Sequence, residues 1–316
     1  MKQLSPFDLM NTLFVGLLIS LAFGGLSFLV VYSLEDSSDA TRFAAAYLGS
    51  FNTAISFGLI IGTALIVYRS QTFIPDVIKS TFSTEQLAGT DYFKYRDRFN
   101  SLGDSVTFMA EFAVVAFAIF AYCDFPLSPV SNAAMLIAAS AQWALGVYVG
   151  RKLCYAGMML HSLKSVTVHR NLFKLRELDG INSYVHIAST LTIIFVYVHV
   201  RACFQGPFLY HSALGESLKL FLVLPAVIAT PVLLIFNFYP RLVLRKLYAA
   251  SIDVEIRELQ AALQDEAASP FSKRSYLISF DKMCRDELRY SMQLTLSDLP
   301  IGITILIMIL EPLVRR

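Results

Sequence analysis

Four polar side chains fall at a similar depth near one end of the long apolar segments of this chain: Glu111, His186, Asn237 and Asp298. An ionisable side chain inside an apolar segment is costly to keep there, so it suggests a function by default. The Glu111 carboxylate should seek a partner, and His186 is the nearest candidate by residue type. We interpret the four residues as a candidate path for ions or protons. The alternative is that each side chain reaches separately into the lipid headgroups.

One apolar segment contains two internal prolines, Pro225 and Pro231. Each proline removes a backbone hydrogen bond and kinks a helix. Because discontinuous helices line the binding sites of transporters, we interpret the two prolines as a candidate hinge. A static kink is the alternative.

Four cysteines are spread along the chain, and none forms a C-x-x-C pair, so the sequence gives no zinc or redox motif. Cys123 and Cys203 each end an apolar segment on the side that we expect to face outward. They form a candidate disulfide if the outside is oxidising and their Cα atoms come within about 7 Å. Two unpaired thiols are the alternative. We expect Cys154 and Cys284 to lie inside and stay reduced.

The familiar enzyme motifs are absent from the sequence. There is no G-x-x-x-x-G-K-[ST] loop, no G-x-G-x-x-G, no G-x-S-x-G and no H-E-x-x-H. Asp36 and Asp39 form a single D-x-x-D pair, which we interpret as a solvated acidic turn. His186 and His199 would lie about 140° apart around one helix, so they do not share a haem-binding face. We therefore expect no enzymatic activity, no cofactor and no metal.

The elements that must position these residues follow from composition. The chain has 316 residues, of which 56% are hydrophobic and 16% charged, whereas a soluble domain carries about 25% charged residues. The net charge of +2 is too small to favour a nucleic-acid partner. These values predict an integral membrane protein whose main partner is the lipid bilayer.

Six apolar segments approach or exceed the length of about 20 residues that a membrane span needs. A seventh, Leu299–Leu310, is shorter and either spans or lies against the others. Solid apolar runs without alternation predict helices rather than barrel strands. The six segments are Thr12–Tyr32, Phe43–Tyr68, Val106–Tyr122, Ser131–Gly150, Tyr184–Arg201 and Leu218–Tyr239.

The connections between these segments alternate in charge. Most Lys and Arg residues lie in the stretches that follow the second, fourth and sixth segments, while the first connection carries Glu35, Asp36 and Asp39. The positive-inside rule therefore places the N-terminus and the three basic stretches in the cytoplasm. We expect a multi-pass protein of the cell membrane.

The predicted fold is an all-α polytopic bundle of six or seven transmembrane helices, arranged as three hairpins plus a C-terminal apolar helix. Residues 1–240 form the bundle, with basic cytoplasmic loops at 69–104 and 151–182. Residues 241–297 form a cytoplasmic helical segment, and 298–316 form the apolar C-terminal segment. Gly58 with Gly62, and Gly146 with Gly150, form G-x-x-x-G motifs that favour close helix packing, within the chain or between subunits.

Three functions fit this pattern. We expect a channel or pore-type oligomer for small ions, because apolar spans dominate and intramembrane polar groups are few. A small-ion or proton-coupled carrier is one alternative. A non-catalytic membrane anchor, scaffold or effector subunit is the other. In each case we expect a homo-oligomer or a partner membrane subunit.

The charge asymmetry predicts which side of the membrane each connection faces. Single cysteines at Lys94, Lys164 and Lys273 should react with a membrane-impermeant thiol reagent only from the cytoplasmic side. Cysteines at Asp36 and Pro126 should react only from the outside. Labelling of all five positions from one face would contradict the hairpin topology.

Overall fold

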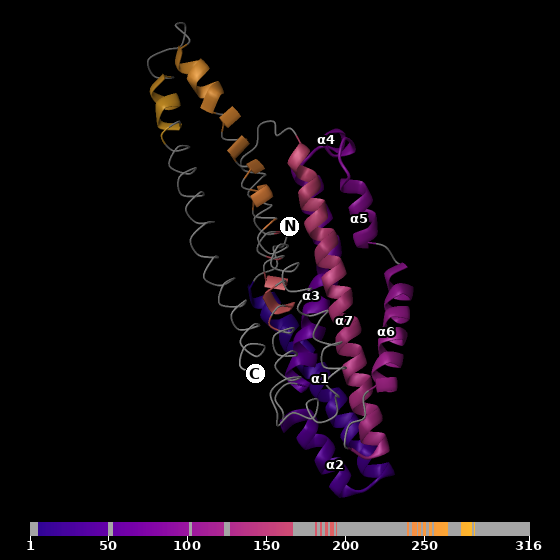
Figure 1. The fold of residues 1–316 in the computed structure, drawn as a ribbon. Coiled ribbons are helices and arrows are strands. Elements are labelled where there is room, and N and C mark those ends of the chain that lie inside the picture. The colour runs from indigo at the N-terminus through magenta and orange to yellow at the C-terminus, as the bar shows by residue number, and fades with distance from the viewer. Residues whose placement is uncertain are drawn as a thin grey trace, which may run out of the picture.

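The computed structural model describes residues 6–49, 53–100, 103–122 and 127–166, together with parts of 181–194, 239–264 and 273–281. Within this described part every regular element is a helix and no strand occurs, which confirms the all-helical class there. Figure 1 shows α7 running along α5 and α6, with α2 at one end and α4 at the other. The elements are α1 (Pro6–Leu34), α2 (Ser37–Ala44), the π-helical η1 (Ala45–Gly49), α3 (Thr53–Thr81), α4 (Thr84–Ala88), α5 (Tyr92–Asn100), α6 (Gly103–Tyr122), α7 (Pro129–Ser162) and the 3-10 turn η2 (Leu163–Ser165).

Three helical stretches are long and apolar enough to cross a membrane: Met10–Leu34, Thr53–Thr81 and Pro129–Ser165. One side of α1 exposes large apolar side chains, including Phe14 at 60% and Leu26 at 65%. An extended exposed apolar face of this kind belongs against lipid or another chain rather than against water. These features support association with a membrane. The count of six or seven spans and the three-hairpin arrangement stay predictions.

Three predicted boundaries differ from the structure. The second apolar segment was expected at 43–68, but its helix, α3, runs over Thr53–Thr81. The residues before it form a separate helix, α2, which begins after its N-cap Asp36; the Asp36 carboxylate accepts a hydrogen bond from the Asp39 N–H at 2.8 Å. The expected loops at 69–104 and 151–182 also begin as helix, since α3 continues to residue 81 and α7 to residue 162.

A row of small residues on α1 forms its contact with the following elements. Thr12, Gly16, Ser20 and Gly24 recur at every fourth position, and all four are buried. We call them the small-residue ladder of α1. Residues spaced by four lie on one face of a helix, and this face of α1 packs on α3 at Thr12 and Gly16 and on Tyr47 of η1 at Gly24.

The middle of the ladder brings the backbones of α1 and α3 together. A Cβ built on Gly16 would lie 2.5 Å from the Gly58 carbonyl oxygen and 2.5 Å from the Gly62 nitrogen. One predicted G-x-x-x-G motif therefore packs within the chain. Glycines permit this approach because any side chain would separate the backbones.

Hydrogen bonds fix the register of α1 against α3. Ser20 Oγ donates to the Ala54 carbonyl oxygen at 2.7 Å and also contacts the Tyr47 hydroxyl at 2.9 Å. At the other end of the ladder, the Arg69 guanidinium donates to Thr12 Oγ1 at 2.8 Å. Because Thr12 precedes Ser20 while Arg69 follows Ala54, the two helices run antiparallel.

α7 packs on another side of α3 through buried amide and hydroxyl groups. Ser56 Oγ donates to Gln142 Oε1 at 3.2 Å, and Gln142 Nε2 donates to the Thr53 carbonyl oxygen at 3.4 Å. Ser56 and Gln142 are 3% and 1% exposed. Polar side chains paired in this way hold apolar helices together where no hydrophobic force acts between them.

The ends of α3 and α7 that hold α4 and α5 form a packed unit (residues 69–100 and 151–166), which we call the inner head after the side of the membrane that the charge pattern predicts for it. Its centre contains Ile78, Leu87, Tyr92, Phe99 and Leu160, each no more than 1% exposed. Tyr92 donates its hydroxyl hydrogen to the Pro75 carbonyl oxygen at 3.2 Å, which joins α5 to α3. Burial raises the pKa of Tyr92 to about 12, so the phenol stays protonated and keeps this hydrogen bond.

At the opposite end, Glu35 after α1 caps the start of α7. Its carboxylate accepts hydrogen bonds from the Ser128 hydroxyl and from the Val130 N–H at 2.9 Å. A helix N-terminus offers unpaired N–H groups and a positive dipole end, so a carboxylate is stabilised there. Desolvation acts to raise the pKa of Glu35, but the hydrogen bonds from Ser128, Val130 and Ser131 outweigh it and lower the pKa.

Gly16→Ala should destabilise the protein by about 1–3 kcal/mol, because the added methyl group meets backbone atoms that cannot rotate away. Gly25→Ala is the matched control, since nothing lies within 4 Å of a Cβ at this neighbouring exposed position. Thermal unfolding in detergent micelles measures both changes. Equal melting temperatures for the two variants would show that α1 and α3 do not touch through this glycine.

The Glu35 cap should make stability depend on pH. A lowered folded pKa contributes stability that is present above the unfolded pKa of about 4.3 and is lost as the pH falls through the folded value. The melting temperature of the parent should therefore exceed that of Glu35→Gln at pH 7, and the difference should shrink below about pH 4. A difference that does not vary between pH 3 and pH 7 would contradict the cap.

Candidate functional site

Charged and polar side chains gather where the inner head meets the apolar parts of the bundle. We call this group the inner polar cluster. Its members come from four helices, and one of these, α5, contributes a backbone carbonyl group. Its members are Gln71 of α3, the Phe99 carbonyl group of α5, Glu111 of α6, and Tyr148, Arg151 and Lys152 of α7.

Glu111 and Arg151 form an ion pair between α6 and α7. Their side chains are 24% and 19% exposed, so the pair is largely withdrawn from the surroundings. The second carboxylate oxygen of Glu111 is buried and has no hydrogen-bond partner among the described residues. A charge in such a place is tolerated because its partner neutralises it.

Lys152, the next residue of α7, is fully buried. Its ammonium group donates a hydrogen bond to the Phe99 carbonyl oxygen in the last turn of α5. Two aromatic rings lie close to the same ammonium group, with centroids 5.5 Å away for Phe99 and 5.8 Å away for Tyr148. The negative faces of aromatic rings attract a cation, which offsets part of the cost of burying it.

Tyr148 joins α7 to α3 and provides a second contact with α6. Its hydroxyl accepts a hydrogen bond from Gln71 Nε2 of α3 at 3.1 Å. Its ring meets the Phe108 ring of α6 edge to face, with centroids 6.1 Å apart. The cluster is therefore the place where α3, α5, α6 and α7 are all fixed to one another.

Of the predicted site residues, the structure describes only Glu111. Glu111 lies in the cluster, with Arg151 as an ion-pair partner that the sequence analysis did not name. His186, Asn237 and Asp298 lie outside the described residues, so their proximity to Glu111 stays a prediction. The prolines of the candidate hinge, Pro225 and Pro231, and the cysteines of the candidate disulfide, Cys123 and Cys203, lie outside them as well.

The described residues contain no cluster of three or more His, Cys, Asp or Glu side chains that could hold a metal ion. The chemistry that the cluster does offer is electrostatic. It contains one carboxylate and two cations, held by hydrogen bonds and aromatic rings.

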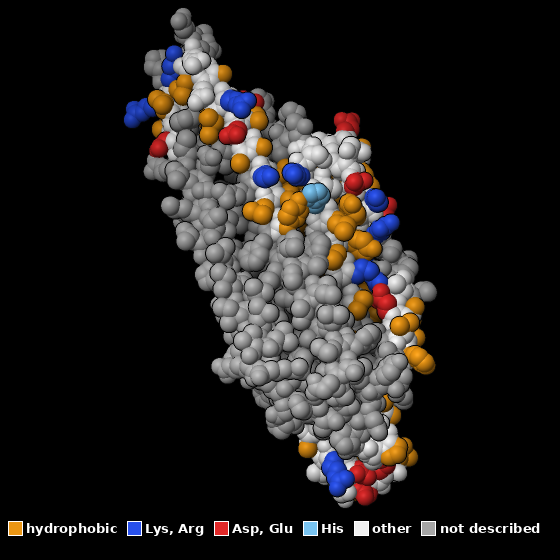
Figure 2. Space-filling model, viewed as in Figure 1, with side chains coloured by type: hydrophobic (Ala, Val, Ile, Leu, Met, Phe, Trp, Pro, Cys, Tyr) orange, Lys and Arg blue, Asp and Glu red, His pale blue; other side chains and the backbone are white. Residues whose placement is uncertain are grey.

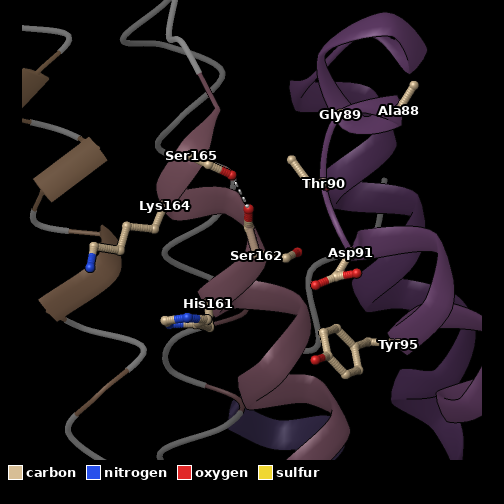
Figure 3. A pocket seen from close by; sticks show the side chains of 9 residues that line it. All are labelled: Ala88, Gly89, Thr90, Asp91, Tyr95, His161, Ser162, Lys164 and Ser165. Carbon is tan, nitrogen blue, oxygen red and sulfur yellow. Dashed lines mark hydrogen bonds between the residues drawn. The ribbon is translucent and has the colours of Figure 1, made fainter.

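A second feature of the inner head is an open cleft of about 740 Å³ between the α4–α5 segment and the end of α7. In Figure 3, Thr90, Asp91 and Tyr95 point from that segment toward α7. His161 and Lys164 point away to the other side of α7. His161 contacts the Tyr239 hydroxyl there through Nδ1. The cleft is polar and lies at the far end of the inner head from the inner polar cluster.

No protein-family model matches the chain, and neither a curated protein nor a solved structure matches it. The function is therefore inferred from the residues and their geometry.

Glu111→Gln should destabilise the protein by about 1–3 kcal/mol, because it removes the carboxylate charge that faces the Arg151 guanidinium. Replacing both residues with leucine should recover part of that loss, since an apolar pair of similar volume carries no unpaired charge.

Asp97→Asn is the control for this prediction. Asp97 pairs with Arg96 at the surface of α5 and is 66% exposed, and exposed pairs contribute little to stability. Chemical unfolding of the three variants in micelles makes the comparison. If Glu111→Gln costs no more than Asp97→Asn, the α6–α7 ion pair does not hold the cluster.

Proposed function

We propose that the protein is a multi-pass integral membrane protein that serves as a membrane anchor or effector subunit, with its inner head in the cytoplasm. The observation that carries this proposal is the continuity of α3 and α7 with the inner head. α7 has 34 residues, which at about 1.5 Å per residue exceeds a hydrocarbon core of about 30 Å. A force or a partner acting on the head therefore acts directly on the bundle.

The distribution of charge supports this orientation. The inner head carries exposed cations at Lys79, Lys94, Arg98 and Lys164. Figure 2 shows Lys and Arg side chains with some acidic ones among them toward the α4–α5 end, and acidic side chains beside a basic one at the α2 end. Since positive charge is retained on the cytoplasmic side, the N-terminus and the inner head belong inside and the Glu35–Asp36 turn outside.

The way polar groups are used at membrane depth also supports an anchor. Ser20 with Ala54, and Ser56 with Gln142, bond one helix to another. Such pairs give rigidity to a bundle. The cleft of the inner head, by contrast, opens to the surroundings and has the volume typical of small-molecule sites. Contact with a soluble partner or ligand thus belongs to the head.

One observation favours a second function, a channel or pore-type oligomer for small ions. The Glu111–Arg151 pair lies where the inner head meets the apolar parts of α6 and α7, and both side chains keep some exposure. Charges in or next to apolar spans commonly mark ion or proton paths. In an oligomer, or beside a partner membrane subunit, this surface would face a shared interior.

Flux measurements in liposomes separate these functions. The purified protein is reconstituted and ion and proton flux are compared with those of empty liposomes, for the parent and for Glu111→Gln. Flux at the level of empty liposomes supports the anchor. Passive flux that changes in Glu111→Gln supports the channel and overturns the anchor, while saturable flux coupled to a second ion or proton indicates a carrier.

A further inference from the structure

Two consecutive residues of α7 hold two different helices. Arg151 pairs with Glu111 of α6, and Lys152 donates to the Phe99 carbonyl oxygen of α5. Consecutive positions on a helix point about 100° apart, so neighbouring side chains reach separate partners. Figure 1 shows α5 and α6 one after the other along α7.

Lys152 does for α5 what a helix C-cap does. α5 ends at Asn100, and the Phe99 carbonyl group lies in its last turn. The last four carbonyl groups of a helix have no partner within the helix, and they form the negative end of the helix dipole. A cation placed there by another helix satisfies one carbonyl oxygen and interacts favourably with the dipole.

Arg151 holds α6 against α7 through its ion pair with Glu111. Glu111 lies in the first half of α6, which begins at Gly103 and ends at Tyr122. The ion pair therefore holds the part of α6 that follows most closely on α5. Between them, the two cations fix the end of α5 and the first half of α6 to the same turn of α7.

We propose that Arg151 and Lys152 form a joint that couples the position of the inner head to α6. When α5 separates from α7, the turn of α7 that holds Glu111 through Arg151 loses its support. When the Arg151–Glu111 pair breaks, the same turn holds α5 less firmly. This inference goes beyond the proposed function and does not depend on it, because it concerns contacts within one chain. In an anchor the joint relays contact at the head; in a channel it links the head to an intramembrane charge.

Amide hydrogen exchange in α5 tests the joint on the full-length protein in lipid nanodiscs. Lys152→Met removes the ammonium group and retains an apolar side chain, so α5 amides should exchange about tenfold faster. Glu111→Gln should also speed exchange in α5, although Glu111 contacts α7 rather than α5 in the described structure. The double variant should exchange no faster than Lys152→Met alone, because either change already opens the joint.

Two controls separate coupling from general loss of stability. Lys164→Met changes an exposed cation on the same side of the bundle, and Gly16→Ala disturbs the α1–α3 contact instead. Neither should change exchange in α5. If Lys152→Met does not fold, Phe99→Leu takes its place, since it keeps the carbonyl group and removes one ring from the ammonium group.

The proposal fails if Glu111→Gln leaves α5 exchange at the parent level. It also fails if the double variant shows the product of the two single effects, because independent contacts behave in that way.

Discussion

The close approach of α1 to α3 is the constraint on which the described structure depends. Gly16 has no side chain, and a Cβ there would meet the backbone of Gly58 and Gly62. Because the backbones touch, the short Ser20 side chain reaches the Ala54 carbonyl oxygen, and Arg69 binds Thr12 farther along the same contact. Separating the helices by the width of a methyl group would break the Ser20 hydrogen bond. The small-residue ladder thus sets the register of the first two apolar helices.

This register makes α3 the central helix. In their most apolar parts, 67% of α3 is buried against 22% of α1, so α1 keeps a broad exposed apolar face. α7 then packs on α3 through Gln142 and Tyr148, and it carries the inner polar cluster beyond them. Polar side chains have two roles in this arrangement. Amides and hydroxyls join helices within the bundle, and the charged side chains of Arg151 and Lys152 join the bundle to the inner head.

Much of this arrangement was predictable from sequence, and the failures have physical causes. Hydropathy placed α1 and the start of α7 well, but it joined Phe43 to the next helix, because an apolar run does not show where one helix ends and another begins. The ladder was visible as Thr12, Gly16, Ser20 and Gly24, but a search for glycine pairs alone misses it. The Arg151 partner was not predictable. A symmetric α6–α7 hairpin would place Glu111 opposite Ser140, whereas Glu111 pairs with Arg151 and Phe108 meets Tyr148.

Oxygen accessibility of nitroxide labels placed singly along α1, from residue 12 to residue 26, tests the central claim most directly. The protein is studied in lipid bilayers, where dissolved oxygen reaches labels that face the acyl chains. Gly16 and Gly24 carry no label, because a side chain at either position would itself displace the neighbouring atoms. Low accessibility is expected at the partly buried positions 13, 17 and 23, which flank the ladder, and high accessibility at the exposed positions 14, 18, 21 and 25. Uniformly high accessibility along α1, or minima on another face of the helix, would show that α1 does not lie against α3 through its small residues.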